Sequence, residues 1–389
     1  MKKVYIIATL ALSCFAISCS NEDLDGINGG EGVSVEDKYV PGDSEVAISL
    51  GTIAKRAAID GENGDLDEMG VFCLAKAKNQ INQSAYDIDW FGNGHKWSSC
   101  VLANVSAKKE GAKVSWTDEV TYYYPLSQFY AYDFFAYYPY VNDSNRLDTI
   151  NNKVKVRYEI DGKQDIIWGK ASSDERYAYC AKYFRIPENE NKKPMLQMYH
   201  MLTRLIFKVR PGAKVEGGLE VGEAANMEIV SIKIIDVLKH IEMTVADFEN
   251  PVSIGGTTAS ELSQQLLTNY TAETDTFTLC DANGVEISQN PVAVGSDINI
   301  ATQVGESIML YPDSQYLVQI ETRYKNGDSY INLPPTEEPL IIYNNGGKFE
   351  AGLKYTVDIT VHGPKEIEVE ANLNPWEDAL ESENPKLDL

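Results

Sequence analysis

Val154-Lys155-Val156-Arg157-Tyr158-Glu159-Ile160 is a run in which apolar side chains alternate with charged ones. Because successive side chains of a β-strand point to opposite sides, this period of two predicts a strand with one apolar face and one charged face. Signals with the period of a helix are sparse. The clearest lies at residues 260–270, where Ser260 is the predicted N-cap of one short helix. We therefore expect an all-β protein with few short helices.

The same alternation recurs towards the C-terminus beside turn signals. Residues 318–324 alternate and run into Asn326-Gly327, a dipeptide that favours a tight hairpin turn. Residues 330–333 are therefore predicted to return as the partner strand. Two more hairpins are predicted from the same kind of pattern: residues 355–361 with 367–373, and residues 277–280 with 285–287. Many short strands at this spacing predict β-sandwiches.

The chain of 389 residues is long enough for two domains. An apolar run ends at Arg210-Pro211-Gly212, and a Gly- and Glu-rich stretch separates it from the next strand pattern. Proline and glycine at such a junction favour a domain boundary. We predict two β-sandwich domains, at residues 45–212 and 226–376, followed by an acidic tail at residues 377–389.

The N-terminal end of the chain has the pattern of an export signal. Two lysines precede an almost wholly apolar run at residues 4–17, which is too short to span a bilayer comfortably. Residues 1–18 are therefore predicted to be a removable signal peptide. The sequence Ala16-Ile17-Ser18-Cys19 resembles the bacterial lipobox. This predicts lipidation of Cys19, with palmitate as an expected acyl chain, and anchoring to the outer membrane.

Two alternatives to this modification stay open: lipidation at Cys14, and an ordinary secretory signal with an incidental Cys19. Residues 19–44 are rich in Gly, Asp, Glu and Asn and are predicted to form a flexible acidic tether. The whole chain carries a formal net charge of -24. Because such a chain repels polyanions, we expect no nucleic-acid partner.

Residue patterns for catalysis or metal binding are missing from the sequence. The four histidines lie far apart, and none belongs to a pair with metal-ligand spacing. Beyond Cys19, the chain has four scattered cysteines without a Cys-x-x-Cys motif, namely Cys73, Cys100, Cys180 and Cys280. One disulfide and buried free thiols are both open. We expect no catalytic residue, no metal and no cofactor, although the abundant Asp and Glu leave a glycosidase-type carboxylate pair open.

Aromatic residues are concentrated at residues 122–140. Exposed rings in a row could stack on sugar rings, so a surface glycan-binding lipoprotein is the alternative function. Residues 129–137, however, carry apolar groups at both odd and even positions, which is typical of strands that are buried on both faces. We therefore expect these rings to lie mainly in the core.

Several short motifs follow one another along the chain: Tyr124-Pro125-Leu126, Asp133-Phe134-Phe135-Ala136-Tyr137-Tyr138-Pro139-Tyr140, Asp165-Ile166-Ile167-Trp168, His200-Met201-Leu202-Thr203-Arg204-Leu205, Phe349-Glu350-Ala351-Gly352-Leu353-Lys354-Tyr355-Thr356 and Pro375-Trp376. In this order the sequence resembles the fimbrillin family, whose members are subunits of the type V pili of Gram-negative bacteria. The resemblance spans most of the mature chain. It implies two β-sandwich domains resembling transthyretin and a structural role in a surface fimbrium, without catalysis.

The resemblance also implies a mechanism of assembly. Fimbrillins are exported as lipoproteins, an arginine-specific protease removes the first strand, and a strand from another subunit fills the vacant groove. By this resemblance the removable strand comprises Val46, Ala47, Ile48, Ser49 and Leu50, and cleavage is expected between Arg56 and Ala57. The alternative is a dibasic loop that is never cut. The implied partners are other fimbrillin subunits, the maturation protease and, through the lipid, the outer membrane.

The acidic tail departs from the pattern of a stalk subunit, which carries an alternating apolar strand at its C-terminus for donation. Residues 377–389 contain a proline and have weak strand character. The resemblance therefore favours a tip or accessory subunit of a surface-exposed fimbrium on the outer membrane, contributing to adhesion. An anchor subunit would keep its lipid and escape cleavage, and Arg56 argues against that role.

Overall fold

β-Strands make up most of the structure. The computed structural model describes residues 46–54, 65–76, 101–124, 131–173, 178–214, 221–336, 338–344, 347–364 and 366–374. Within these ranges strands far outnumber the two α-helices, so the predicted all-β class is confirmed. Over the same ranges, no helix has both the length and the apolar character needed to span a bilayer.

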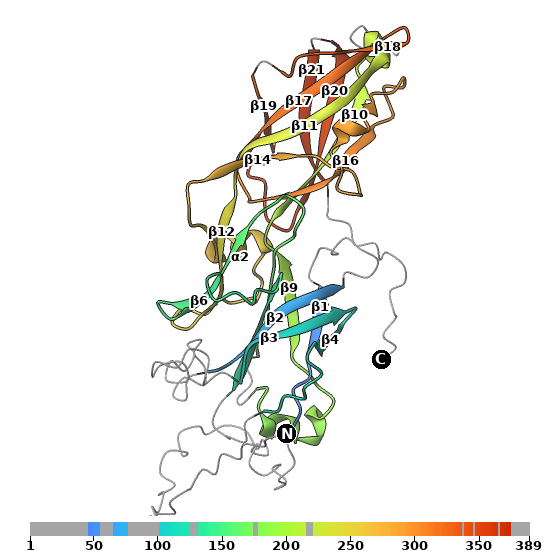
Figure 1. Cartoon of the computed structure of the whole chain (residues 1–389). Helices are drawn as coiled ribbons and strands as arrows, with labels where there is room; N and C mark the ends of the chain where they lie inside the picture. The colour runs from blue at the N-terminus through green and yellow to red at the C-terminus, as the bar shows by residue number, and fades with distance from the viewer. Residues whose placement is uncertain are drawn as a thin grey trace, which may run out of the picture. The chain divides into compact units, whose positions relative to one another are not determined.

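Seven strands close into a barrel in the order β1-β4-β3-β2-β5-β8-β9. They are β1 (Gly51–Ala54), β2 (Leu66–Ala75), β3 (Leu102–Glu110), β4 (Lys113–Trp116), β5 (Tyr132–Tyr138), β8 (Ile167–Ala171) and β9 (Met195–His200). Figure 1 shows β1 to β4 together in one part of the molecule. Neighbouring strands are antiparallel except β1 and β9, which are parallel. The shortest of these strands, β1 and β4, have four residues each and are neighbours in the barrel.

One wall of the barrel is buried on both faces, as β5 illustrates. Tyr132, Phe134 and Ala136 point into the core inside the barrel. Phe135 and Tyr137, which alternate with them, belong to a second core outside it. Since successive side chains of a strand point to opposite sides, one aromatic run can supply two cores. The prediction that these rings are core residues is confirmed for β5.

A four-stranded sheet in the order β13-β12-β7-β6 covers this outer face. Its strands are β6 (Leu147–Ile150), β7 (Lys153–Glu159), β12 (His240–Asp247) and β13 (Leu267–Asn269). The buried indole N–H of Trp168 in β8 donates to the carbonyl of Val245 in β12 at 2.8 Å, which links the barrel to the sheet. In β7, Val154, Val156 and Tyr158 are buried, as the alternation predicts.

Two further sheets share the core outside the barrel. One has the order β16-β10-β20-β21 and contains β10 (Thr203–Pro211), β16 (Thr302–Leu310), β20 (Lys354–Gly363) and β21 (Glu366–Asn374). The other has the order β14-β11-β17-β18, with β15 beside β11 and β19 beside β17. Its strands are β11 (Met227–Leu238), β14 (Thr274–Thr278), β15 (Val292–Ala293), β17 (Gln315–Asn326), β18 (Ser329–Asn332) and β19 (Leu340–Tyr343).

Two of the three predicted hairpins are confirmed. β17 and β18 pair across the Asn326-Gly327 turn, and β20 pairs with β21. The third hairpin, predicted for residues 277–280 with 285–287, is wrong in detail. β14 ends at Thr278 and pairs with β11, and the predicted partners share an isolated bridge between Cys280 and Glu286. The carboxylate of Asp281 accepts two backbone N–H bonds in the following loop, a local competitor of strand pairing.

The predicted helix exists but has different ends. α2 spans Ala259–Leu266, and its N-cap is Thr258 rather than Ser260. The Thr258 hydroxyl accepts from the N–H of Glu261 at 3.2 Å, and the Glu261 carboxylate accepts from the N–H of Thr258 at 2.8 Å. This capping box fixes the first turn. The other helical segments are α1 (Ala181–Phe184) and the 3-10 helices η2 (Pro187–Asn189), η3 (Glu223–Asn226) and η4 (Ile287–Gln289).

Several strand pairings cross the position where the sequence predicts a domain boundary. β7 precedes residues 212–226 and β12 follows them, yet the two strands pair along most of their length. β10 also precedes the predicted boundary and pairs with β16 and β20 beyond it. From Val46 onward the described residues belong to one compact unit. The division into two transthyretin-like sandwiches stays a prediction.

Candidate functional site

The segment of residues 46–50 lies against the barrel and is held by main-chain hydrogen bonds. Ala47 forms an antiparallel bridge with Tyr123. The N–H of Ile48 donates to the Tyr122 carbonyl at 2.8 Å, and the N–H of Tyr124 donates to the Val46 carbonyl at 2.9 Å. The predicted removable strand, which lies just ahead of β1 in the sequence, therefore pairs with residues 122–124.

β1 continues this segment and has a partner on each side. The N–H of Gly51 donates to the Pro194 carbonyl at 3.0 Å, ahead of the parallel register with β9. On the other side, the N–H of Thr52 donates to the Ala112 carbonyl at 3.0 Å next to β4. The strand thus joins β4 to β9. Its removal would leave unpaired backbone groups on both neighbours, which is the chemical basis of strand addition.

The side chains of this segment alternate between core and solvent. Ile48 and Leu50 are 4% and 1% exposed and belong to the core inside the barrel. Thr52 is also buried, and its hydroxyl donates to the Gly111 carbonyl at 3.2 Å. Ser49 and Ile53 face the solvent. Burying an aliphatic side chain stabilises the folded state by ~1.5–3 kcal/mol. Ile48 and Leu50 therefore supply much of the free energy that keeps this short segment bound to the barrel.

Gly51 marks a close approach between β1 and its parallel neighbour. A Cβ atom at this position would lie 2.5 Å from Met195 Sδ and 2.8 Å from Lys193 Cε. Real Cβ atoms do not come this close to other heavy atoms, so both side chains would have to move. A strand with glycine between the positions of Leu50 and Thr52 therefore fits this place without displacing either side chain.

The other predicted site residues fall into two groups. Cys19, Arg56, Ala57 and Cys100, together with the signal peptide, the tether and the tail, lie outside the described residues. Within the described chain, Cys180 and Cys280 are free thiols, and Cys73 is buried. Burial raises the pKa of the Cys180 thiol, which lowers its reactivity.

The alternative of a glycan platform finds little support in the described part of residues 122–140. Tyr124, Tyr132, Phe134 and Tyr137 are buried, whereas Tyr123 is exposed. A row of solvent-facing rings is therefore not formed by these residues. The described residues also contain no group of three or more His, Cys, Asp or Glu side chains that could hold a metal ion.

One polar contact between two of the sequence motifs was not predicted. The Nδ1 atom of buried His200 pairs with the carboxylate of Asp165, next to the register pair Ile167 and His200 of β8 and β9. No short spacing signals this contact, because the two residues are 35 positions apart. The pair connects the residue at the end of β9 with the segment just ahead of β8.

The sequence matches the family model described as fimbrillin-like over residues 56–376. No curated protein matches the sequence.

Three solved structures align with most of this chain at low sequence identity. A candidate cell adhesion protein from Bacteroides uniformis is 16% identical, with a TM-score of 0.46 over 87% of this chain and 100% of that one. A candidate cell adhesion protein from Bacteroides ovatus is 12% identical, with a TM-score of 0.44 over 86% and 99%. The fimbrial anchor protein Mfa2 from Porphyromonas gingivalis is 9% identical, with a TM-score of 0.30 over 85% and 98%.

Proposed function

The chain belongs to the fimbrillin-like family, and from this premise we propose that it is a surface fimbrial subunit that assembles by strand donation. The observation that carries the proposal is the position of residues 46–54 in the barrel. This segment has backbone partners on both sides and buries Ile48 and Leu50. A groove that loses it exposes two edges and two apolar sites at once, and a strand from another subunit satisfies all of them together.

Cleavage after Arg56 is the proposed trigger. Lys55 and Arg56 directly follow β1 in the sequence, so a trypsin-like protease that cuts there separates the strand covalently from the rest of the barrel. The match to the family model begins at residue 56, on the C-terminal side of the strand. This agrees with a first strand that is not part of the mature subunit.

Export and location follow from the N-terminal pattern. Lipidation of Cys19 holds the precursor at the outer membrane until cleavage separates it from its anchor. The acidic tail at residues 377–389 has weak strand character, so we assign the chain to the tip or an accessory position of the fimbrium, where a subunit accepts a strand without donating one. A role in adhesion is part of this proposal.

The direct test is limited proteolysis of the unlipidated precursor with trypsin, followed by native mass spectrometry. The expected product begins at Ala57 and exchanges its clipped strand for an added, isotope-labelled peptide of residues 46–54. A variant with Lys55→Gln and Arg56→Gln is the matched control and should neither be cut there nor exchange. Cleavage at Ala57 with no uptake of the labelled peptide would overturn strand donation.

The same assay tests the position in the fimbrium. A labelled peptide of residues 377–389 should not enter the groove, because it lacks alternating apolar residues. A peptide of residues 46–54 with Leu50→Asp serves as a control for specificity. If the tail peptide competes with the strand peptide, the chain can donate as well as accept, and the assignment to a tip or accessory position is wrong.

A further inference from the structure

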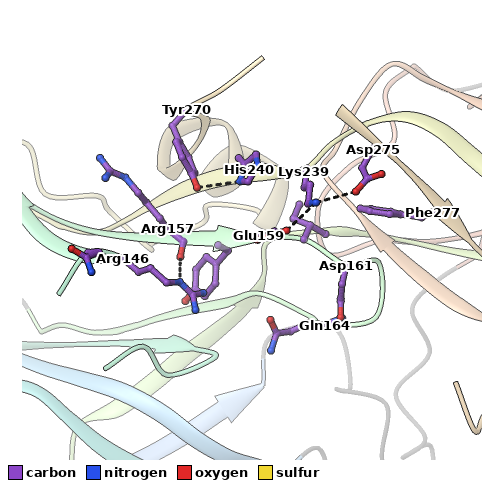
Figure 2. Close-up of a pocket in the computed structure, with 13 residues that line it drawn as sticks. Arg146, Arg157, Glu159, Asp161, Gln164, Lys239, His240, Tyr270, Asp275 and Phe277 are labelled. Carbon is purple, nitrogen blue, oxygen red and sulfur yellow. Dashed lines mark hydrogen bonds and ion pairs between the residues drawn. The ribbon is translucent and has the colours of Figure 1, made fainter. Parts of the chain in front are cut away.

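A pocket of about 750 Å³ lies where the sheet of β6, β7, β12 and β13 approaches β14. Figure 2 shows its labelled side chains, which come from β7 and the loop after it, the turn between β11 and β12, and β14; Arg146 lies just ahead of β6 and Tyr270 just after β13. The volume falls within the range of small-molecule sites in proteins. The pocket is remote in sequence from residues 46–54 and contains none of them, so it is independent of strand donation.

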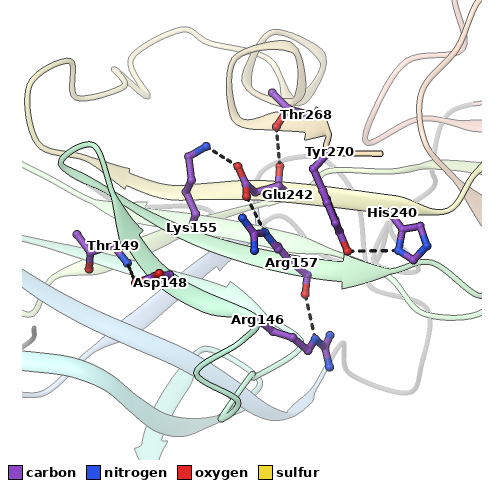
Figure 3. Close-up of polar contacts among 9 residues, drawn as sticks. All are labelled: Arg146, Asp148, Thr149, Lys155, Arg157, His240, Glu242, Thr268 and Tyr270. Carbon is purple, nitrogen blue, oxygen red and sulfur yellow. Dashed lines mark hydrogen bonds and ion pairs between the residues drawn. The ribbon is translucent and has the colours of Figure 1, made fainter. Parts of the chain in front are cut away.

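Three cations line this pocket in a chain whose net charge is -24. Two of them are paired: Arg157 with Glu242 at 2.9 Å, and Lys239 with both Glu159 and Asp275 at 2.9 and 3.0 Å. Figure 3 shows the Arg157 pair beside the backbone contact with Arg146. Cations that already have carboxylate partners contribute little net attraction for a further anion.

Arg146, the third cation, differs from the other two in its contacts. Its Nε donates to the Arg157 carbonyl at 3.1 Å, and the N–H of Arg157 donates to the Arg146 carbonyl at 2.7 Å. The guanidinium is therefore oriented through one nitrogen. Within the described residues no carboxylate forms an ion pair with it. Its two terminal amino groups have the planar fork that binds a carboxylate with two hydrogen bonds.

Tyr270 supplies an aromatic surface at the same pocket. Tyr270 is 41% exposed. Its hydroxyl is hydrogen-bonded to Nδ1 of His240 at 3.2 Å, and the Arg157 guanidinium lies 5.4 Å from the ring centroid. These contacts fix an amphipathic ring at the edge of the pocket, where it can cover the apolar face of a bound molecule.

Oxygen acceptors complete the lining. Lys239 bridges the carboxylates of Glu159 and Asp275, and Asp161 is fixed by accepting from the N–H groups of Lys163 and Gln164 at 2.8 and 3.0 Å. These carboxylates repel a ligand with several negative charges. They are, however, good acceptors for hydroxyl donors, and their positions are set before a ligand arrives.

We propose that this pocket binds a carboxylated pyranose, the chemical class of uronic and sialic acids. The single carboxylate pairs with Arg146, the ring lies against Tyr270, and the hydroxyl groups donate to Glu159, Asp161 and Asp275. A neutral sugar lacks the charge that Arg146 attracts. A phosphate or a polysulfated glycan carries more negative charge than one available cation can balance beside three carboxylates.

The test is a titration of the full unlipidated chain with glucuronic acid and with N-acetylneuraminic acid, followed by protein-detected NMR. At least one of them should bind saturably with a Kd of order 1 mM, as expected for one charged pair plus a few hydrogen bonds. Glucose should bind at least about tenfold more weakly, and acetate likewise, because each supplies only part of the recognition.

Three variants locate the site. Arg146→Gln and Tyr270→Ala should each weaken binding by about tenfold or more, a change of about 1.4 kcal/mol. Arg210 lies in β10 outside the pocket, so Arg210→Gln should leave binding of the sugar unchanged. Arg146 is exposed, so its replacement should not alter the thermal unfolding midpoint, which serves as the check on folding.

Three outcomes would overturn the proposal. The first is no saturable binding of either acidic sugar up to about 20 mM. The second is acetate binding as tightly as the sugars, which would reduce the pocket to a simple anion site. The third is sugar binding that is unaffected by Arg146→Gln.

Discussion

The first and the last described strands, β1 and β21, are held in opposite ways. β1 has four residues and pairs with β4 on one side and β9 on the other, so it closes a barrel. β21 has nine residues and pairs along β20, while its other side, among the described residues, makes only an isolated bridge between Ala371 and Asn344. β1 is thus a short strand between two partners, whereas β21 is a long strand at the edge of its sheet.

The side chains repeat this contrast. The segment leading into β1 buries Ile48 and Leu50 inside the barrel. β21 alternates glutamates with apolar residues, and of the latter Ala371 is buried while Leu373 is 54% exposed. Charged residues on an edge strand discourage further pairing. The position of a strand in its sheet, rather than its length, therefore decides how much is exposed when it is lost.

The largest expected effect is at Leu50. Leu50→Ala removes a side chain that is 1% exposed and leaves a cavity inside the barrel, so we expect a loss of about 2–5 kcal/mol in the free energy of unfolding. Chemical denaturation of the uncut precursor measures it. Ser49→Ala, at the exposed neighbouring position, is the matched control and should change stability by less than about 0.5 kcal/mol. Equal effects at the two positions would mean that the segment does not insert as described.

A smaller effect is expected at Gly51. Gly51→Ala places a Cβ 2.5 Å from Met195 Sδ, and the resulting shift of flexible side chains should cost about 1–3 kcal/mol. Gly363→Ala in β20 is the control, because no heavy atom lies within 4 Å of the Cβ that it adds. Thermal unfolding of both variants compares them. A stability gain in Gly51→Ala would contradict the close approach of β1 to β9.

Some of this contrast could be predicted from the sequence. The alternation at residues 355–361 and 367–373 identifies β20 and β21, because a short turn leaves few ways to pair them. Residues 46–50 were predicted as a strand, yet the regular strand β1 begins at Gly51. Periodicity identifies an extended segment well, but it locates the ends of that segment poorly.

The partners of β1 could not be predicted. Its parallel neighbour β9 lies far along the chain, and alternation defines which face of a strand is buried without defining which strand lies beside it. The same limit applies to β7 and β12, whose pairing crosses the predicted domain boundary. The residues of the pocket around Arg146 also come from distant segments, and no spacing within the sequence brings Arg146 together with Tyr270.

The smallest expected effect is at the edge strand. Leu373→Ala should change the free energy of unfolding by less than about 0.5 kcal/mol, because the side chain is 54% exposed. Chemical denaturation under the conditions used for Leu50→Ala gives the comparison directly. A loss as large as that of Leu50→Ala would mean that another part of the chain or a second subunit covers β21 in solution. In that case the last strand would be enclosed like the first, and the contrast between a closing strand and an edge strand would be lost.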